Sequence, residues 1–176
     1  LFYVIGAREV ALYTIATAFP DQIKSYVKNI YFMLQARFAT SSLGRIFSNT
    51  KQLTLISIVF LIIITVLYIV CAPFLIHIFF PTYPDAVFLS VLYALGIMSS
   101  LFTIPSLALR AKKKEKALVK IHLFRGVTYC TLVFVGTWYF GIVGTVIGKI
   151  IGDYIYTISY YVMMYKISKP EVDVVV

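Results

Sequence analysis

Residues 52–84 read QLTLISIVFLIIITVLYIVCAPFLIHIFFPTYP and contain no Asp, Glu, Lys or Arg. Two further stretches, residues 86–109 and 126–148, are also free of these charged side chains. Each stretch is longer than the roughly 20 residues that a helix needs to cross the hydrocarbon core of a bilayer. Because an open strand edge in lipid would leave backbone groups without hydrogen-bond partners, the three stretches predict membrane-spanning helices.

The composition of the whole chain also excludes a water-soluble domain. Of its 176 residues, 61% are hydrophobic and 13% are charged, whereas soluble domains have about 45–50% apolar and about 25% charged residues. The net charge of +9 comes from basic residues that lie between the apolar runs, which is typical of a topology signal, so we expect no nucleic-acid partner. No Cys or His has a companion at metal-ligand spacing and no catalytic dyad emerges, so we expect no metal, no cofactor and no enzymatic activity.

The apolar runs and their boundaries predict an all-α fold, a polytopic transmembrane helix bundle of about five spans. The predicted spans are residues 9–38, 53–80, 86–109, 117–138 and 142–165. Pro81 and Pro84 form a turn between the second and third spans, and Gly141 ends the fourth span in left-handed geometry. Residues 1–169 then form one transmembrane domain, and residues 170–176 form a short cytoplasmic tail.

Basic residues are found in alternate connections of this bundle. The turns at residues 81–85 and 139–141 contain none, whereas the other connections contain Arg37, Arg45 and Lys51, then Arg110 to Lys120, then Lys166 and Lys169. Cytoplasmic loops are the ones enriched in Lys and Arg. The sequence therefore predicts a multi-pass protein of the cytoplasmic (inner) membrane, with the N-terminus of the chain outside and its C-terminus in the cytoplasm.

A polar stripe runs along the first predicted span. At 100 degrees per residue, one sector of the helix contains Tyr13, Thr14, Thr17, Asp21, Lys24, Lys28, Tyr31 and Gln35. Lys24 is about 20 Å along the axis from both ends of the span, too far for easy snorkelling. A lysine facing lipid costs roughly 2.5–3.5 kcal/mol, so we expect the stripe to face a bundle interior or a hydrated cavity. Two alternatives stay open: the segment lies flat on the membrane surface, or Asp21 and Lys24 form a purely structural pair.

The fifth predicted span has two faces. Lys149 and Asp153, four residues apart, could form a structural ion pair within the helix or could line a cavity. Gly144, Gly148 and Gly152 lie about 100 degrees away, at the four-residue spacing that lets a neighbouring backbone approach closely. We expect this glycine face to pack against another helix.

Four short segments carry a resemblance to a known family. They are GAREVALY at residues 6–13, FFPTY at 79–83, AKKKEK at 111–116 and YFGIVGT at 139–145. In their order and spacing they resemble the C-terminal half of a lipid-linked oligosaccharide (O-antigen or polysaccharide) flippase of the multidrug/oligosaccharidyl-lipid/polysaccharide exporter superfamily. In that family, the span that follows the segment matched by residues 6–13 normally ends in Pro-Lys/Arg-Phe, whereas this chain reads QARF at residues 35–38, without the proline.

The resemblance implies a transporter with two helical lobes around a central cavity, of which this chain is most of the second lobe. Its partners would be the N-terminal lobe, membrane lipids and a polyprenyl-diphosphate-linked oligosaccharide, which it would move by alternating access during cell-surface polysaccharide (lipopolysaccharide O-antigen) biosynthesis. Lys24 and Lys28 would attract the diphosphate, and Thr17 and the tyrosines would contact sugar hydroxyls. The full set of expected substrate-binding residues is Lys24, Lys28, Asp21, Thr17, Tyr31, Gln35, Lys149 and Asp153.

Two alternative functions stay open at this point. A membrane-embedded glycosyltransferase or polysaccharide polymerase would also have many spans and also handle polyprenyl-linked sugars. Such enzymes usually need a catalytic cluster in a sizeable loop, and the longest connection, residues 39–52, has no acidic residue. A drug exporter of the same superfamily would more naturally offer carboxylates and aromatic rings to a cationic drug.

Overall fold

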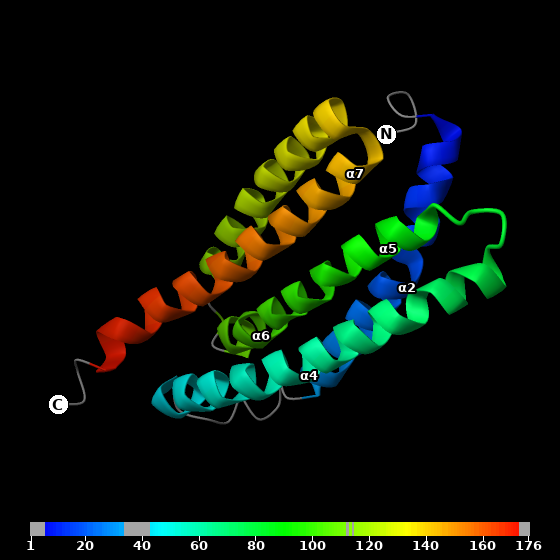
Figure 1. Ribbon diagram of the computed structural model, residues 1–176. Coiled ribbons are helices and arrows are strands. Elements are labelled where there is room, and N and C mark those ends of the chain that lie inside the picture. The colour runs from blue at the N-terminus through cyan, green and yellow to red at the C-terminus, as the bar shows by residue number, and fades with distance from the viewer. Residues whose placement is uncertain (1–5, 34–42, 112, 114, 173–176) are drawn as a thin grey trace.

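The computed structural model describes residues 6–33, 43–111, 113 and 115–172. Every regular element in these ranges is a helix, which confirms the all-α prediction for them. The elements are α2 (Ala7–Phe32), α4 (Leu43–Phe79), α5 (Ala86–Ala94), the 3₁₀-helix η1 (Leu95–Phe102), α6 (Thr103–Ala111) and α7 (Glu115–Val172). Because α5, η1 and α6 follow one another without a break, residues 86–111 form a single central rod (Figure 1).

Three helical segments of the described chain are long and apolar enough to cross a membrane, which indicates a membrane-embedded protein. They are Gln52–Phe79, Ala86–Arg110 and Glu115–Lys166. This number is smaller than the five spans predicted from the sequence, for two reasons. The polar and charged residues of α2 lower its hydropathy below that of a simple lipid-facing span. In addition, the fourth and fifth predicted spans lie within one helical segment, α7.

α7 folds back on itself at Gly141. The backbone there has φ 59° and ψ −136°, a left-handed conformation that glycine adopts without a Cβ clash. The two arms of α7, residues 115–140 and 142–172, then run antiparallel (Figure 1). Thr137 and Thr145 join the arms through a 2.7 Å hydrogen bond between their hydroxyls. The predicted turn at residues 139–141 is therefore confirmed.

The glycine face of the second arm packs against the first arm, as the sequence predicted. A Cβ atom added at Gly148 would lie 2.6 Å from the carbonyl oxygen of Leu132, and Gly144 lies even more closely against the backbone of Gly136. At Gly152 the nearest atom belongs to the Tyr129 side chain, at 3.3 Å. At Gly136, Gly144 and Gly148, the arms are therefore too close for any side chain larger than a hydrogen atom.

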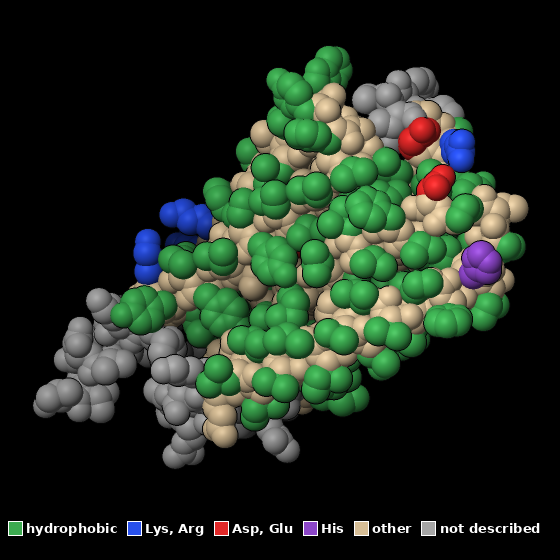
Figure 2. Space-filling model, in the orientation of Figure 1, with side chains coloured by type: hydrophobic (Ala, Val, Ile, Leu, Met, Phe, Trp, Pro, Cys, Tyr) green, Lys and Arg blue, Asp and Glu red, His purple; other side chains and the backbone are tan. Residues whose placement is uncertain are grey.

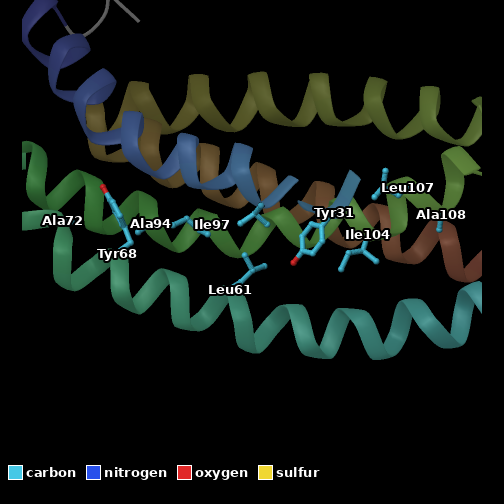
Figure 3. Close-up of a cluster of buried hydrophobic side chains, with 10 residues drawn as sticks. Tyr31, Leu61, Tyr68, Ala72, Ala94, Ile97, Ile104, Leu107 and Ala108 are labelled. Atoms are coloured by element: carbon cyan, nitrogen blue, oxygen red, sulfur yellow. The ribbon is translucent and has the colours of Figure 1, made fainter. Parts of the chain in front are cut away.

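The central rod contacts α2, α4 and α7, and so organises the bundle. One cluster of buried side chains fills the space between α2, α4 and the rod (Figure 3). Its members are Val27, Tyr31, Leu61, Tyr68, Ala72, Ala94, Ile97, Ile104, Leu107 and Ala108. Tyr68 also forms a 2.5 Å hydrogen bond with Ser90. Since lipid tails are as apolar as these side chains, helix association here depends on close packing and hydrogen bonds.

Several predicted boundaries differ from the observed ones. α4 begins at Leu43, ten residues before the predicted second span, and α7 continues to Val172, past the predicted end of the fifth span. Residues 170–172 of the predicted tail are thus helical, and residues 173–176 lie outside the described residues. Helical hydrogen bonds continue beyond the apolar run, so hydropathy alone does not fix where these helices end.

Charged side chains gather at the two ends of the bundle on the face seen in Figure 2. Hydrophobic side chains cover its middle, in the pattern expected of a belt that faces lipid. Lys and Arg side chains lie near the junction of α6 and α7, and acidic side chains lie near the opposite end. Lys24 and Asp153, whose side chains are almost completely buried, lie between the helices instead.

Candidate functional site

Lys24 of α2 points into the bundle, as the polar stripe predicted. Only 7% of its side chain is exposed. Its Nζ donates to the hydroxyl of Tyr93 at 3.1 Å and to Oδ2 of Asp153 at 3.5 Å, and it lies 3.9 Å from Oδ1 of Asp21. An ammonium group buried between helices needs such partners because its transfer from water is costly.

Tyr93 of α5 is the centre of the site and is completely buried. Its hydroxyl donates a 2.6 Å hydrogen bond to Oδ1 of Asp21 while accepting the one from Lys24. Its ring also lies beneath two ammonium groups, with the Nζ of Lys24 4.3 Å and the Nζ of Lys149 4.5 Å from the ring centroid. A single tyrosine thus stabilises two lysines through cation–π contacts and positions a carboxylate.

Lys149 and Asp153 each bind a residue of α2 across the helix interface. Lys149 Nζ lies 3.3 Å from Oδ2 of Asp21, and Asp153 accepts from Lys24. Asp153 also accepts from Arg125, on the other arm of α7, at 3.3 Å. The structure therefore replaces the possible Lys149–Asp153 ion pair with three other pairs, two to α2 and one to the first arm of α7.

We define the charge network as Asp21, Lys24, Tyr93, Arg125, Lys149 and Asp153. It contains three cations and two carboxylates, so it has one positive charge in excess at pH 7. The side chains of Lys24 and Asp153 are 7% and 12% exposed, whereas those of Asp21 and Arg125 are 46% and 38% exposed. The network is therefore buried at its centre and open at two of its members.

The other predicted site residues lie outside the charge network. Lys28 is half-buried, with its Nζ 5.3 Å from the ring centroid of Phe102. Thr17 is buried and donates to the Thr14 carbonyl at 3.3 Å, and Tyr31 belongs to the apolar cluster facing α4. Gln35 lies outside the described residues. The stripe spans too wide an angle for all its members to face one neighbour.

A second group of rings adjoins the network through Arg125. The guanidinium of Arg125 lies 4.3 Å from the ring centroid of Tyr156, which is buried against Phe102 and Tyr160. His122 is near both tyrosines, with its Nδ1 3.2 Å from the hydroxyl of Tyr156. The guanidinium held by these contacts donates to Oδ1 of Asp153, whereas Lys24 donates to Oδ2.

Sequence reasoning missed Tyr93 and Arg125. Arg125 is a charged residue inside the predicted fourth span, and a charged side chain within a membrane span usually pairs with another polar or charged group. Tyr93 had a weaker signal, the spacing of Ser90, Tyr93 and Ser100 on one side of the third predicted span. Only the packing of this rod against α2 and α7 identifies Tyr93 as the residue that joins the charges.

The charge network has the chemistry of an anion-binding site. Two ammonium groups and one guanidinium can each donate to an anionic oxygen, and charge-assisted bonds of this kind are about twice as strong as neutral ones. Asp21 and Asp153 occupy these donors in the present state. No protein-family model, curated protein or solved structure matches the chain.

Proposed function

We propose that the chain is one lobe of a two-lobed transporter that moves a polyprenyl-diphosphate-linked oligosaccharide from the cytoplasmic to the outer leaflet of the inner membrane by alternating access. The observation that carries the proposal is the charge network, which has more cations than carboxylates and is partly open at membrane depth. Lys24, Lys149 and Arg125 would bind the diphosphate. Lys28, one turn from Lys24, would lie beside the same path.

The excess positive charge favours an anionic substrate over the alternatives. A diphosphate could bind Lys149 when this lysine turns away from Asp21, whose side chain is 46% exposed and can be solvated, while Asp153 keeps Lys24 and Arg125 as partners. A cationic drug would be repelled by the same groups. Both carboxylates of the network are bound to cations, an arrangement that suits charge compensation better than the acid–base chemistry of a glycosyltransferase.

An apolar groove on another side of α2 suits the polyprenyl chain of this substrate. The groove has a volume of about 360 Å³ and lies between α2 and α4. Its lining residues are Ile23, Tyr26, Val27, Ile30, Phe60, Ile64, Leu67, Tyr68 and Cys71. A ligand with a diphosphate and a long apolar chain could use both surfaces of α2, since a helix is only about 10 Å across.

The arrangement of the helix ends supports the expected orientation. The start of α4, the α6–α7 junction and the end of α7 lie at one end of the bundle, where the sequence has its basic connections (Figure 1). The α4–α5 turn and the turn at Gly141 lie at the other end. With the basic end in the cytoplasm, the positive-inside rule is satisfied for every connection.

The proposal is tested by surface-glycan export in cells that depend on the full-length protein. We expect the double variant Lys24→Ala, Lys149→Ala to export at least roughly 100-fold more slowly, because each of the two lost charge-assisted bonds removes about 1.5–3 kcal/mol. Arg in place of both lysines should be milder, since it keeps the charge and its planar donors suit phosphate. Arg8→Ala, Lys166→Ala, which removes two charges at exposed positions outside the network, is the matched control. Normal export by the double Ala variant at matched protein abundance would refute the proposal.

A further inference from the structure

A second basic site lies at the junction of α6 and α7, away from the charge network. It is a hollow of about 600 Å³ lined by Lys113, Glu115, Lys116, Ala117, Lys120 and Met163. Lys116 and Lys120 are one helical turn apart on the first arm of α7, Lys113 comes from the connection, and Met163 comes from the second arm. The hollow is therefore formed where the two arms of the hairpin meet the basic connection.

The hollow has an excess of positive charge that the described part of the chain does not neutralise. Three lysines and one glutamate line it, and no ion pair joins any of these lysines to a described acidic side chain. Residues 110–120 contain six basic residues and one acidic residue in all. Lysines this close repel one another, so an anion with several oxygens would stabilise the site.

A strip of exposed apolar side chains leads from the hollow into the membrane-spanning part of α7. Val119, Leu123 and Val127 are 57%, 67% and 71% exposed, and they follow one another at four-residue spacing. In an α-helix this spacing places them on one face, the face that also carries Lys116 and Lys120. The surface thus has a cationic head and an apolar track next to each other.

We propose that the hollow binds the phosphate headgroup of an anionic membrane phospholipid, whose acyl chain lies along Val119, Leu123 and Val127. Basic pockets at the ends of membrane helices attract such headgroups, with about 1 kcal/mol for each Lys or Arg near the surface. A phospholipid supplies both the phosphate oxygens and the chain that this surface accommodates. The inference does not depend on what the charge network transports.

The test is native mass spectrometry of the purified chain titrated with phosphatidylglycerol. We expect one lipid to be retained per chain, with an affinity that falls about fivefold for each lysine removed, or about 25-fold for Lys116→Ala, Lys120→Ala. Arg8→Ala removes one charge at an exposed position at the opposite end of the bundle, beside Asp85, and should change the affinity less than twofold, against about fivefold for Lys116→Ala alone. Lys116→Arg, Lys120→Arg keeps both charges and should bind the lipid as the unaltered protein does. Thermal unfolding will show whether the Ala variant is folded.

Two further titrations separate the headgroup from the chain. Phosphatidylcholine with the same acyl chains should bind at least tenfold more weakly, and so should soluble glycerol phosphate. Leu123→Ser should weaken phosphatidylglycerol binding without changing glycerol phosphate binding. The proposal is overturned if the hollow and control variants lose the same affinity for phosphatidylglycerol, or if phosphatidylcholine binds as tightly as phosphatidylglycerol. It is also overturned if glycerol phosphate binds as tightly as phosphatidylglycerol. The last result would assign the hollow to a soluble phosphate compound.

Discussion

Replacement of Gly148 by alanine tests the hairpin on which the charge network depends. Gly148 lies where the second arm of α7 crosses Leu132 and Val133 of the first arm. An added Cβ would be 2.6 Å from the Leu132 carbonyl oxygen, 2.9 Å from its carbon and 3.2 Å from the Val133 Cα. All three neighbours are backbone atoms, so no side chain can rotate away to make room.

The expected magnitude follows from these distances. Ordinary contact begins near 3.4 Å, so the arms must separate by about 0.8 Å or distort locally, and overpacking of this kind typically costs about 1–3 kcal/mol. Alanine is also the better helix former, by about 1 kcal/mol. Gly126→Ala lies in the same helix and has no atom within 4 Å of its added Cβ, so it gains the higher helix propensity of alanine without a clash. The difference between the two variants is therefore about 1–3 kcal/mol, with Gly148→Ala the less stable.

The free energy of unfolding can be measured for both variants in mixed micelles titrated with a denaturing detergent. Gly152→Ala should fall between them, because its added Cβ meets a movable Tyr129 side chain at 3.3 Å. If Gly148→Ala were as stable as Gly126→Ala, the arms would not be in backbone contact at this position. The close crossing of the hairpin would then be refuted.

Three other predictions concern the network and the topology. Asp153→Asn should lower the free energy of unfolding by roughly 3 kcal/mol, because it leaves three cations with one carboxylate. Lys24→Met leaves each carboxylate with a cation, so it should lower the same free energy by about 1 kcal/mol or less. Equal losses in the two variants would contradict this charge count. Tyr93→Phe should lower the free energy of unfolding by about 1.5–3 kcal/mol, because Asp21 loses the hydrogen bond from the hydroxyl. The double variant Tyr93→Phe, Asp21→Asn should then be about as stable as Tyr93→Phe alone. A cysteine at Thr82 should react with an impermeant reagent in intact cells; labelling only after permeabilisation would reverse the topology.

Tyr31 and Lys24 show that a helical wheel does not predict which helix a side chain contacts. The wheel placed both on one polar stripe because they are seven residues apart. In the structure Lys24 enters the charge network with α5 and α7, while Tyr31 packs among apolar side chains facing α4. The rod crosses α2 at an angle, so residues two turns apart on one face meet different neighbours. Periodicity gives the direction of a side chain but not the identity of its partner.

Lys149 and Asp153 show the same limit for charges. Their spacing permits an ion pair within one helix, and the sequence offered no means of choosing between that pair and partners elsewhere. The structure pairs Lys149 with Asp21 and Asp153 with Lys24 and Arg125, residues more than 25 positions away in every case. Electrostatic energy depends on distance in space, and for these side chains that distance is set by helix packing.

The sequence by itself determined the helical class, the turn at Gly141, the glycine face of the second arm and the burial of Lys24. Each of these depends on local properties: the length of an apolar run, the conformational freedom of one glycine, or the cost of exposing an ammonium group to lipid. Only the tertiary structure decided that Tyr93 joins the charges, that Arg125 belongs to the network and that the basic connection closes a hollow against Met163. Those contacts depend on which helix faces which, and this is set by the shape of side chains brought together from distant parts of the chain.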